Sequence, residues 1–251
     1  MTIESATDPG VEPATGRIAG RPFFVSWSGG KDGYLALHRA VARGGRLAAL
    51  LTMTEADGRR TKSHALPVSL VRRQAAALGV PLVLRGASWD DYENAFLDGL
   101  AELRDGLGLG LGVFGDIDLQ PHRDWVERVC GEAGIEAALP LWLEPRRRLL
   151  DELFAAGVSA TVVVVNGDRL DARFLGRRLD PALVDELEAA GVDACGEEGE
   201  FHTVVTDAPL FAAPVALHVR GTTDVDQYHF IDIVDQSSAP TAAAPDDRRR
   251  P

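Results

Sequence analysis

Short apolar runs alternate with segments of helical periodicity between residues 22 and 134. In the first pair, an apolar run at 22–27 is followed by apolar positions at helical spacing over 34–41. The predicted strands are 22–27, 47–54, 81–86 and 111–115, and the helices predicted after them are 32–43, 66–78, 90–104 and 121–134. Strands separated by helices predict an α/β fold, a parallel sheet with helices on both faces. Ligands bind such sheets at the carboxyl ends of the strands.

The pattern becomes richer in strands after residue 145. The predicted helices there are 149–156 and 181–190, and the predicted strands are 159–165, 203–206, 215–220 and 228–234. A segment rich in Gly and Glu lies at 196–200. We therefore predict two domains, a nucleotide-binding one over 21–145 and a smaller C-terminal α/β domain over 146–235.

Composition narrows the class of protein. Residues 1–20 and 236–251 are rich in Pro, Ala and charge, which predicts disordered tails. The net charge of −12 argues against a broad nucleic-acid face and against anionic membranes. Arg146, Arg147 and Arg148 form either a local basic pocket or a solvated charge run. Without an apolar segment long enough for a leader or a membrane span, and with two cysteines only, the chain is predicted to be cytoplasmic.

Residues 28–33, Ser-Gly-Gly-Lys-Asp-Gly, lie between the first predicted strand and helix. Gly29 and Gly30 let the backbone approach an anion, and the first N–H groups of a helix lack partners within it. The helix dipole favours negative charge at this end. Lys31 adds a compact positive charge, and it and Lys62 are the only lysines among 26 basic residues. The loop is predicted to bind phosphate, with a plain glycine turn as the weaker alternative.

The loop is not a Walker A motif, because residue 25 is Val and residue 32 is Asp. It resembles the PP-loop, Ser-Gly-Gly-x-Asp-Ser, of ATP pyrophosphatases. That resemblance implies a Rossmann-like (HUP-type) sheet and cleavage of ATP between its α- and β-phosphates. Gly33 replaces the last Ser of the motif and removes one hydroxyl contact to phosphate.

A second motif lies at 195–203, Cys-Gly-Glu-Glu-Gly-Glu-Phe-His-Thr, and an Asp-Ala-Pro-Leu-Phe run follows at 207–211. With the first loop it resembles the diphthine–ammonia ligase family, which carries Gly-Glu-Gly-Gly-Glu-aromatic-Glu-Thr here. Glu198 stands in place of Gly, and His202 in place of Glu. The resemblance runs from about Pro22 to Phe211, most of the predicted ordered chain.

The resemblance implies an ATP-dependent amidation. A carboxylate attacks the α-phosphate, giving an acyl-adenylate and pyrophosphate, and ammonia then displaces AMP. ATP and Mg²⁺ are the implied cofactors. The family's acceptor is diphthine, a modified histidine of a translation elongation factor; here the carboxylate acceptor, protein or small molecule, is left open.

Site residues follow from both motifs and from the strand ends. The predicted nucleotide-binding residues are Ser28, Gly29, Gly30, Lys31, Asp32, Gly33, His64 and Asp116. The predicted catalytic residues are Lys31, Asp32, Glu197, Glu200 and His202, and the predicted Mg²⁺ ligands are Asp32, Glu197 and Glu200. Asp32 could instead be a first-turn residue stabilised by the helix dipole. His64 could be a surface loop residue, and Asp116 a helix N-cap.

The acidic cluster supports a cation role. Glu197, Glu198 and Glu200 repel one another unless a cation or donor lies between them. The cluster therefore suits Mg²⁺, or an ammonium ion that a carboxylate base deprotonates. The alternatives are a solvated acidic loop and, for His202, a plain strand residue. Cys195 fits a small buried residue better than a nucleophile.

Two other functions stay open. One is a PP-loop activity on RNA, which the acidic charge and the lack of Cys-x-x-Cys disfavour. The other is a non-catalytic module that binds ATP or AMP, which the Gly33 and His202 departures favour. The sequence leaves homo-oligomerisation open.

Overall fold

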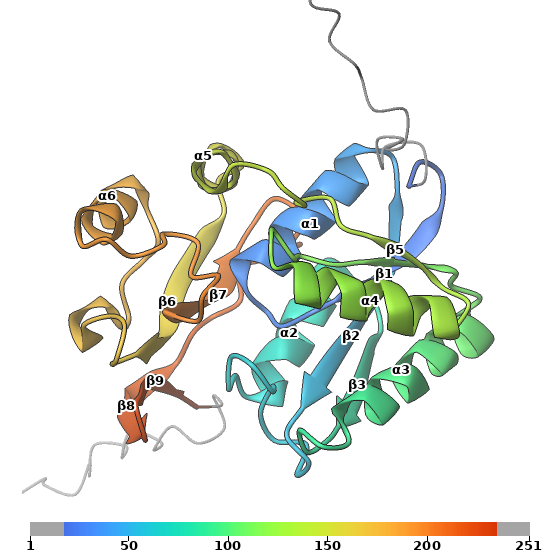
Figure 1. Cartoon of the computed structure of the whole chain (residues 1–251), viewed down its shortest axis with the longest axis horizontal. Helices are drawn as coiled ribbons and strands as arrows, with labels where there is room; N and C mark the ends of the chain where they lie inside the picture. The colour runs from blue at the N-terminus through green and yellow to red at the C-terminus, as the bar shows by residue number, and fades with distance from the viewer. Residues whose placement is uncertain (1–17, 235–251) are drawn as a thin grey trace, which may run out of the picture.

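The computed structural model describes residues 18–234 (Figure 1). The elements in chain order are β1 (Pro22–Ser26), α1 (Lys31–Ala42), β2 (Arg46–Thr54), α2 (Val68–Leu78), β3 (Leu82–Gly86), α3 (Tyr92–Leu107), β4 (Leu111–Val113), α4 (Gln120–Glu132), β5 (Glu136–Ala138), α5 (Arg146–Ala155), β6 (Ser159–Asn166), the 3₁₀ turn η1 (Ala172–Phe174), α6 (Pro181–Ala189), β7 (Phe201–Asp207), β8 (Val219–Val225) and β9 (Tyr228–Ile233). None of the helices in this part of the chain is long and apolar enough to cross a membrane.

The N-terminal half is a five-stranded parallel sheet in the order β3-β2-β1-β4-β5. The central strand β1 is apolar on both faces, as a doubly covered strand must be. Phe23 and Val25 pack with α1 and α2, while Phe24 packs with α3 and α4. The four helices thus cover the two faces in pairs (Figure 1). The predicted Rossmann-like sheet is confirmed.

The C-terminal half contains a four-stranded antiparallel sheet in the order β7-β6-β9-β8. Its central strand β6 is the apolar run predicted over 159–165. The predicted strand at 215–220 is displaced, because the strand β8 lies at Val219–Val225 and every residue of it is exposed. Val215 instead packs into the core from a loop, with its N–H donating to Thr206 O at 2.7 Å.

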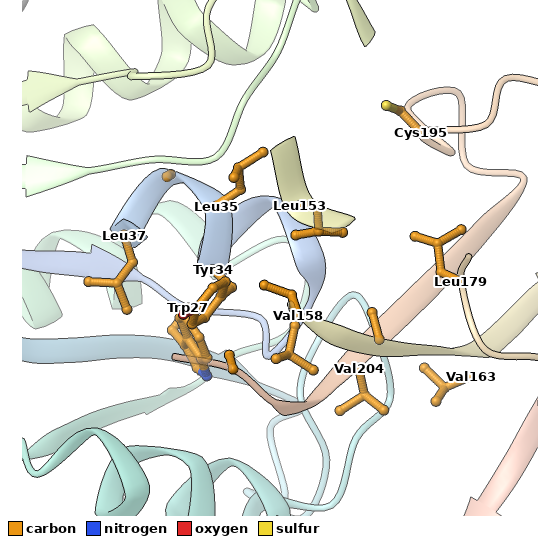
Figure 2. Close-up of a cluster of buried hydrophobic side chains, with 14 of the residues drawn as sticks. Trp27, Tyr34, Leu35, Leu37, Leu153, Val158, Val163, Leu179, Cys195 and Val204 are labelled. Atoms are coloured by element: carbon orange, nitrogen blue, oxygen red, sulfur yellow. The ribbon is translucent and has the colours of Figure 1, made fainter. Parts of the chain in front are cut away.

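One hydrophobic cluster joins the two halves. Trp27 and Tyr34 from the N-terminal half share it with Leu153 of α5, Val163 of β6 and Val204 of β7 (Figure 2). Arg39 of α1 reinforces the contact through a paired hydrogen bond to Glu152 of α5, with Nε 2.9 Å from Oε1. The halves are therefore packed against each other, and the boundary near residue 145 stays a prediction.

The short strand β5 and the turn η1 were not predicted from the sequence, since three-residue elements carry too little periodicity. Of the predicted tails, residues 1–17 and 236–251 lie outside the described residues. Ile18, which we assigned to the first tail, is fully buried in the core.

Candidate nucleotide-binding site

The loop at 28–33 presents free backbone N–H groups at the start of α1. Within residues 18–234, the amides of residues 28, 29, 30, 32 and 33 donate no hydrogen bond. Gly30 occupies the N-cap position and provides no side-chain cap. The loop lies at the carboxyl end of the central strand β1, where ligands bind parallel sheets. These amides can receive an anion.

The loop is fixed from beneath by β7 and α2. Gly29 O accepts hydrogen bonds from Val205 N at 2.9 Å and from Gln74 Nε2 at 3.1 Å. Lys31 N donates to Thr203 Oγ1 at 3.2 Å. Gly29 has a φ of +88°, and a Cβ there would lie 2.8 Å from a methyl of Leu66. Only glycine fits this position, by backbone conformation and by space.

The two motifs face one cleft of about 710 Å³. The first motif contributes Ser28, Lys31, Asp32 and Gly33, and the second contributes Cys195, Gly196, Glu197, Glu198, Gly199, Phe201, His202 and Thr203. Further lining residues include Trp27, Lys62, His64, Tyr92, Asp116, His122 and Arg169. The register of β7 against loop 28–33 brings the motifs together although they are far apart in sequence.

Lys31 is the charged centre of the cleft. Its side chain is only 5% exposed, and Nζ lies 2.9 and 2.7 Å from the two carboxylate oxygens of Asp32. Nζ also donates to the carbonyl oxygen of Cys195, which belongs to the second motif. Burial alone would lower the pKa of Lys31, but the charges of Asp32 and Glu197 outweigh it and raise that pKa. Lys31 therefore stays protonated and joins the two motifs directly.

Glu197 lines the cleft, and its surroundings disfavour the charged form of its carboxyl group. Burial and the neighbouring carboxylate of Asp32 raise the pKa of Glu197 to about 8, although Lys31 opposes the shift. Its backbone N–H donates to Asp193 Oδ2 at 2.8 Å, which fixes the residue in the loop. A carboxyl group near neutrality can exchange a proton with a bound amine.

His64 and His202 form a stacked pair in the cleft, with ring centroids 4.6 Å apart. The Nδ1 atom of His64 lies 2.9 Å from Thr203 O. Since a carbonyl can only accept, Nδ1 carries the proton and Nε2 carries a lone pair. Burial and the charge of Lys31 lower the pKa of His202 to about 4, and burial lowers that of His64 well below 6.5. Both rings are neutral at neutral pH.

Asp116 follows β4 and lines the cleft beside two further titratable groups. One carboxylate oxygen lies 3.4 Å from His122 Nδ1, and this contact raises the pKa of His122. Burial, and then the charge of Asp116, raise the pKa of Tyr92 to about 12. The preceding Gly115 packs against α1, because a Cβ there would lie 2.8 Å from the Gly33 nitrogen.

Glu200 does not reach the cleft. It is 5% exposed, its Oε2 accepts the Glu198 N–H at 3.1 Å, and its carbonyl accepts the Asn166 N–H at 2.9 Å. Gly199, with a φ of +83°, turns the chain between Glu198 and Glu200. This placement argues against the catalytic and metal-binding roles predicted for Glu200 and leaves it holding the loop. Across residues 18–234, no three His, Cys, Asp or Glu side chains are grouped to hold a metal.

Other predicted features are explained by their contacts. Burial raises the pKa of the Cys195 thiol to about 12, so the thiol is a poor nucleophile. Arg147 pairs with Asp185 and Glu188, and Arg148 pairs with Glu144. The arginine run is therefore paired with carboxylates and forms no open basic pocket.

Several cleft residues were not predicted. Lys62 is 9% exposed, with Nζ 2.8 Å from Glu55 Oε2 and 4.6 Å from the ring centroid of Trp89. Its rarity as one of two lysines was the available signal. Arg169 follows β6 and pairs with Glu198 at 3.2 Å. Nothing in the sequence near Arg169 marks it.

Fold and site together define an α/β nucleotide-binding protein, with a parallel sheet, a glycine loop at a helix start and an acidic loop facing it. Comparison with known proteins specifies the family. The Diphthamide synthase N-terminal domain matches residues 23–137, and the Diphthamide synthase C-terminal domain matches residues 145–233. The chain belongs to the diphthamide synthase, or diphthine–ammonia ligase, family.

Named relatives agree with this assignment. The human diphthine–ammonia ligase is 29% identical over 213 residues, which cover 73% of this chain and 78% of the human protein. The rat enzyme is 28% identical over 216 residues, covering 76% and 80%. The Saccharomyces cerevisiae enzyme is 26% identical over 227 residues, covering 75% of this chain and 33% of its own. The predicted membership of an ATP-dependent ligase family is confirmed.

Proposed function

We propose that the chain adenylylates a substrate carboxylate with ATP, releases pyrophosphate and transfers ammonia to form an amide. The observation that carries this proposal is the meeting of Lys31 and Glu197, from separate motifs, in one cleft beside unpartnered amides. A phosphate-binding group and a proton acceptor are the two things this chemistry needs side by side.

The first motif binds the triphosphate in this proposal. The free amides of loop 28–33 hold phosphate oxygens, and Lys31 offsets the charge that develops on the pyrophosphate leaving group. The three donors of the Lys31 ammonium contact the two oxygens of Asp32 and the Cys195 carbonyl, so one of the two Asp32 contacts gives way when the nucleotide binds. His64, in the loop between β2 and α2, and Asp116, just after β4, line the cleft and complete the nucleotide site.

Asp32 and Glu197 would be the carboxylates that hold Mg²⁺, since both line the cleft and burial, followed by the charge of Asp32, raises the pKa of Glu197. Magnesium is usually held by one or two carboxylates together with substrate phosphates, so a complete set of protein ligands is not required. When bound, the ion would neutralise phosphate charge. The remaining chemistry is assigned to the chain's own residues.

The second motif handles the acceptor and the nitrogen. The acceptor carboxylate oxygen attacks the α-phosphorus, the bond to the β-phosphate oxygen breaks, and an acyl-adenylate forms. Glu197, in its carboxylate form, takes a proton from ammonium; ammonia attacks the acyl carbon, and the bond from that carbon to the AMP oxygen breaks, so that AMP leaves. His202 is neutral and offers a ring nitrogen as a hydrogen-bond acceptor for the incoming nitrogen.

Diphthine is the first acceptor to test, since the named relatives are diphthine–ammonia ligases. Two residues that depart from the family motif, Glu198 and His202, both line the cleft. The identity of the acceptor is therefore tested separately from the reaction type. We keep a cytoplasmic location as a prediction.

The test is product analysis with the purified full chain, ATP, Mg²⁺ and ammonium. The acceptors are a diphthine-bearing elongation factor and a panel of small carboxylates. The proposal expects AMP and pyrophosphate in equal amounts, dependent on an acceptor, and an amide product that carries ¹⁵N from labelled ammonium. Release of orthophosphate, or ATP bound but unchanged with every acceptor, would contradict it; the second result would favour a non-catalytic nucleotide-binding module.

A further inference from the structure

Arg146, the first residue of α5, connects the two halves of the protein through ion pairs with Asp118 and Asp193. Its Nε and Nη2 atoms donate to the two carboxylate oxygens of Asp118 at 2.9 and 2.8 Å. Its Nη1 atom lies 2.9 Å from Asp193 Oδ2. Asp118 follows the β4 strand end in the N-terminal half, and Asp193 precedes the second motif. One guanidinium thus spans both halves, using the planar fork that only arginine has.

Asp193 passes this connection on to the second motif. Its Oδ1 accepts the Cys195 N–H at 3.0 Å, and its Oδ2 accepts the Glu197 N–H at 2.8 Å. The Cys195 thiol in turn lies 3.6 Å from the Arg146 carbonyl oxygen. The carbonyl oxygen of Cys195 accepts a hydrogen bond from Lys31 Nζ. A continuous series of hydrogen bonds, with one ion pair between Arg146 and Asp193, therefore runs from Asp118 to the lysine of the first motif.

We propose that Arg146 is a positioning residue, which holds residues 193–197 so that Cys195 O and Glu197 face Lys31. The effect of Arg146 on catalysis rests on the proposed function. Its effect on the structure of residues 193–197 does not. Arg146 lines no part of the cleft, so it acts through Asp193. The side chain of Asp193 is only 12% exposed, so its carboxylate depends on this arginine for charge compensation.

Local amide hydrogen exchange tests the structural part directly in the ligand-free full chain. We compare Arg146→Ala and Asp118→Asn with Arg148→Ala, a control from the same helix turn whose side chain is 70% exposed. In Arg146→Ala the amides of Cys195 and Glu197 should exchange about 10-fold faster or more. Asp118→Asn should give a smaller change at the same two amides, and Arg148→Ala none.

Two results would overturn the proposal. One is unchanged exchange at both amides in Arg146→Ala. The other is acceleration spread evenly over the chain in both Arg146→Ala and Arg146→Lys, which would make Arg146 a general structural residue. Arg146→Lys keeps the charge without the fork, and it decides the question if the alanine variant is poorly folded. Arg146→Lys should speed amide exchange in residues 193–197 and leave amide exchange unchanged in α3, on the far side of the parallel sheet.

Kinetics test the functional part separately. Pyrophosphate release by Arg146→Ala should fall about 10- to 100-fold in kcat, because a reacting group is misplaced. The KM for ATP should change less than about 3-fold, because the amides of loop 28–33 are held by β7 and α2. A raised KM with unchanged kcat would contradict a positioning role. If the parent chain releases no pyrophosphate, the proposed function fails, and the exchange result still decides the loop assignment.

Discussion

The two loops that face the cleft are held in opposite ways. Loop 28–33 is fixed through its backbone, with Gly29 O bonded to Val205 and Gln74 and with no room for a Cβ at Gly29. Loop 193–200 is fixed through side chains, chiefly Asp193, and Gly199 has no atom within 4 Å of a Cβ position. The difference indicates that the phosphate site is preformed, whereas the acidic loop depends on a few charged contacts.

The largest expected effect concerns the residue that joins the loops. Lys31→Met removes the side-chain cation that contacts both motifs, and pyrophosphate release should fall about 100- to 1,000-fold. Steady-state assays with the full chain measure this, with Arg148→Met as an exposed control. Activity within about 5-fold of the parent would mean that Lys31 does not stabilise the leaving group.

A matched pair of glycines tests the difference in packing. Gly29 and Gly199 have φ values of +88° and +83°, so an alanine suffers about 1 to 2 kcal/mol of backbone strain at either position. Only Gly29→Ala also meets Leu66 and Gln74, which should cost about 1 to 3 kcal/mol more. Urea unfolding of both variants gives the difference. Equal losses of stability would show that loop 28–33 is no more tightly packed than loop 193–200.

The pH dependence of stability reports on the acidic loop. Between the unfolded pKa of a glutamate, about 4.3, and the folded pKa of Glu197, about 8, the folded chain keeps a proton that the unfolded chain releases. The free energy of unfolding should therefore decrease as pH rises through this range, by about 1 to 3 kcal/mol.

Glu197→Gln should flatten that part of the stability profile, while Glu198→Gln, at an exposed neighbouring residue, should leave it in place. Chemical unfolding of the ligand-free chain at intervals from pH 5 to 9 is the measurement. A slope that survives in Glu197→Gln would assign the proton to another group.

The smallest expected effect concerns Gly33, which stands where the PP-loop motif has Ser. A Cβ at Gly33 would lie 3.6 Å from Ser26 O and 3.8 Å from Trp27, which is ordinary contact. Gly33→Ser should therefore alter stability by less than about 0.5 kcal/mol. Because Gly33 lines the cleft, the added hydroxyl should tighten ATP binding by a few-fold, or about 1 kcal/mol. Calorimetric titration measures it, and weaker binding would mean that the cleft at Gly33 is already filled by the nucleotide.

Local patterns predicted the first loop well and the second loop only in part. Loop 28–33 follows from strand, glycine turn and helix, all of which are local signals. Glu197 and Glu200 are equivalent by residue type, but beyond the turn at Gly199 the buried Glu200 carboxylate bonds to the Glu198 N–H, whereas Glu197 lines the cleft.

Long-range pairing accounts for the rest of what the sequence did not predict. Arg146 reads as part of a charge run, because its partners Asp118 and Asp193 are distant in sequence. All residues of the strand β8 are exposed, and its sequence has no apolar pattern. The strand was therefore predicted at 215–220, where an apolar run lies just before it.

The most direct test of the account is a crystal structure with Mg²⁺ and an ATP analogue that resists cleavage between the α- and β-phosphates. We expect phosphate oxygens on the amides of residues 28, 29, 30, 32 and 33 and on the Lys31 side chain, with the α-phosphate within reach of an acceptor bound beside Glu197. A triphosphate that contacts one loop only, or that binds outside this cleft, would contradict it.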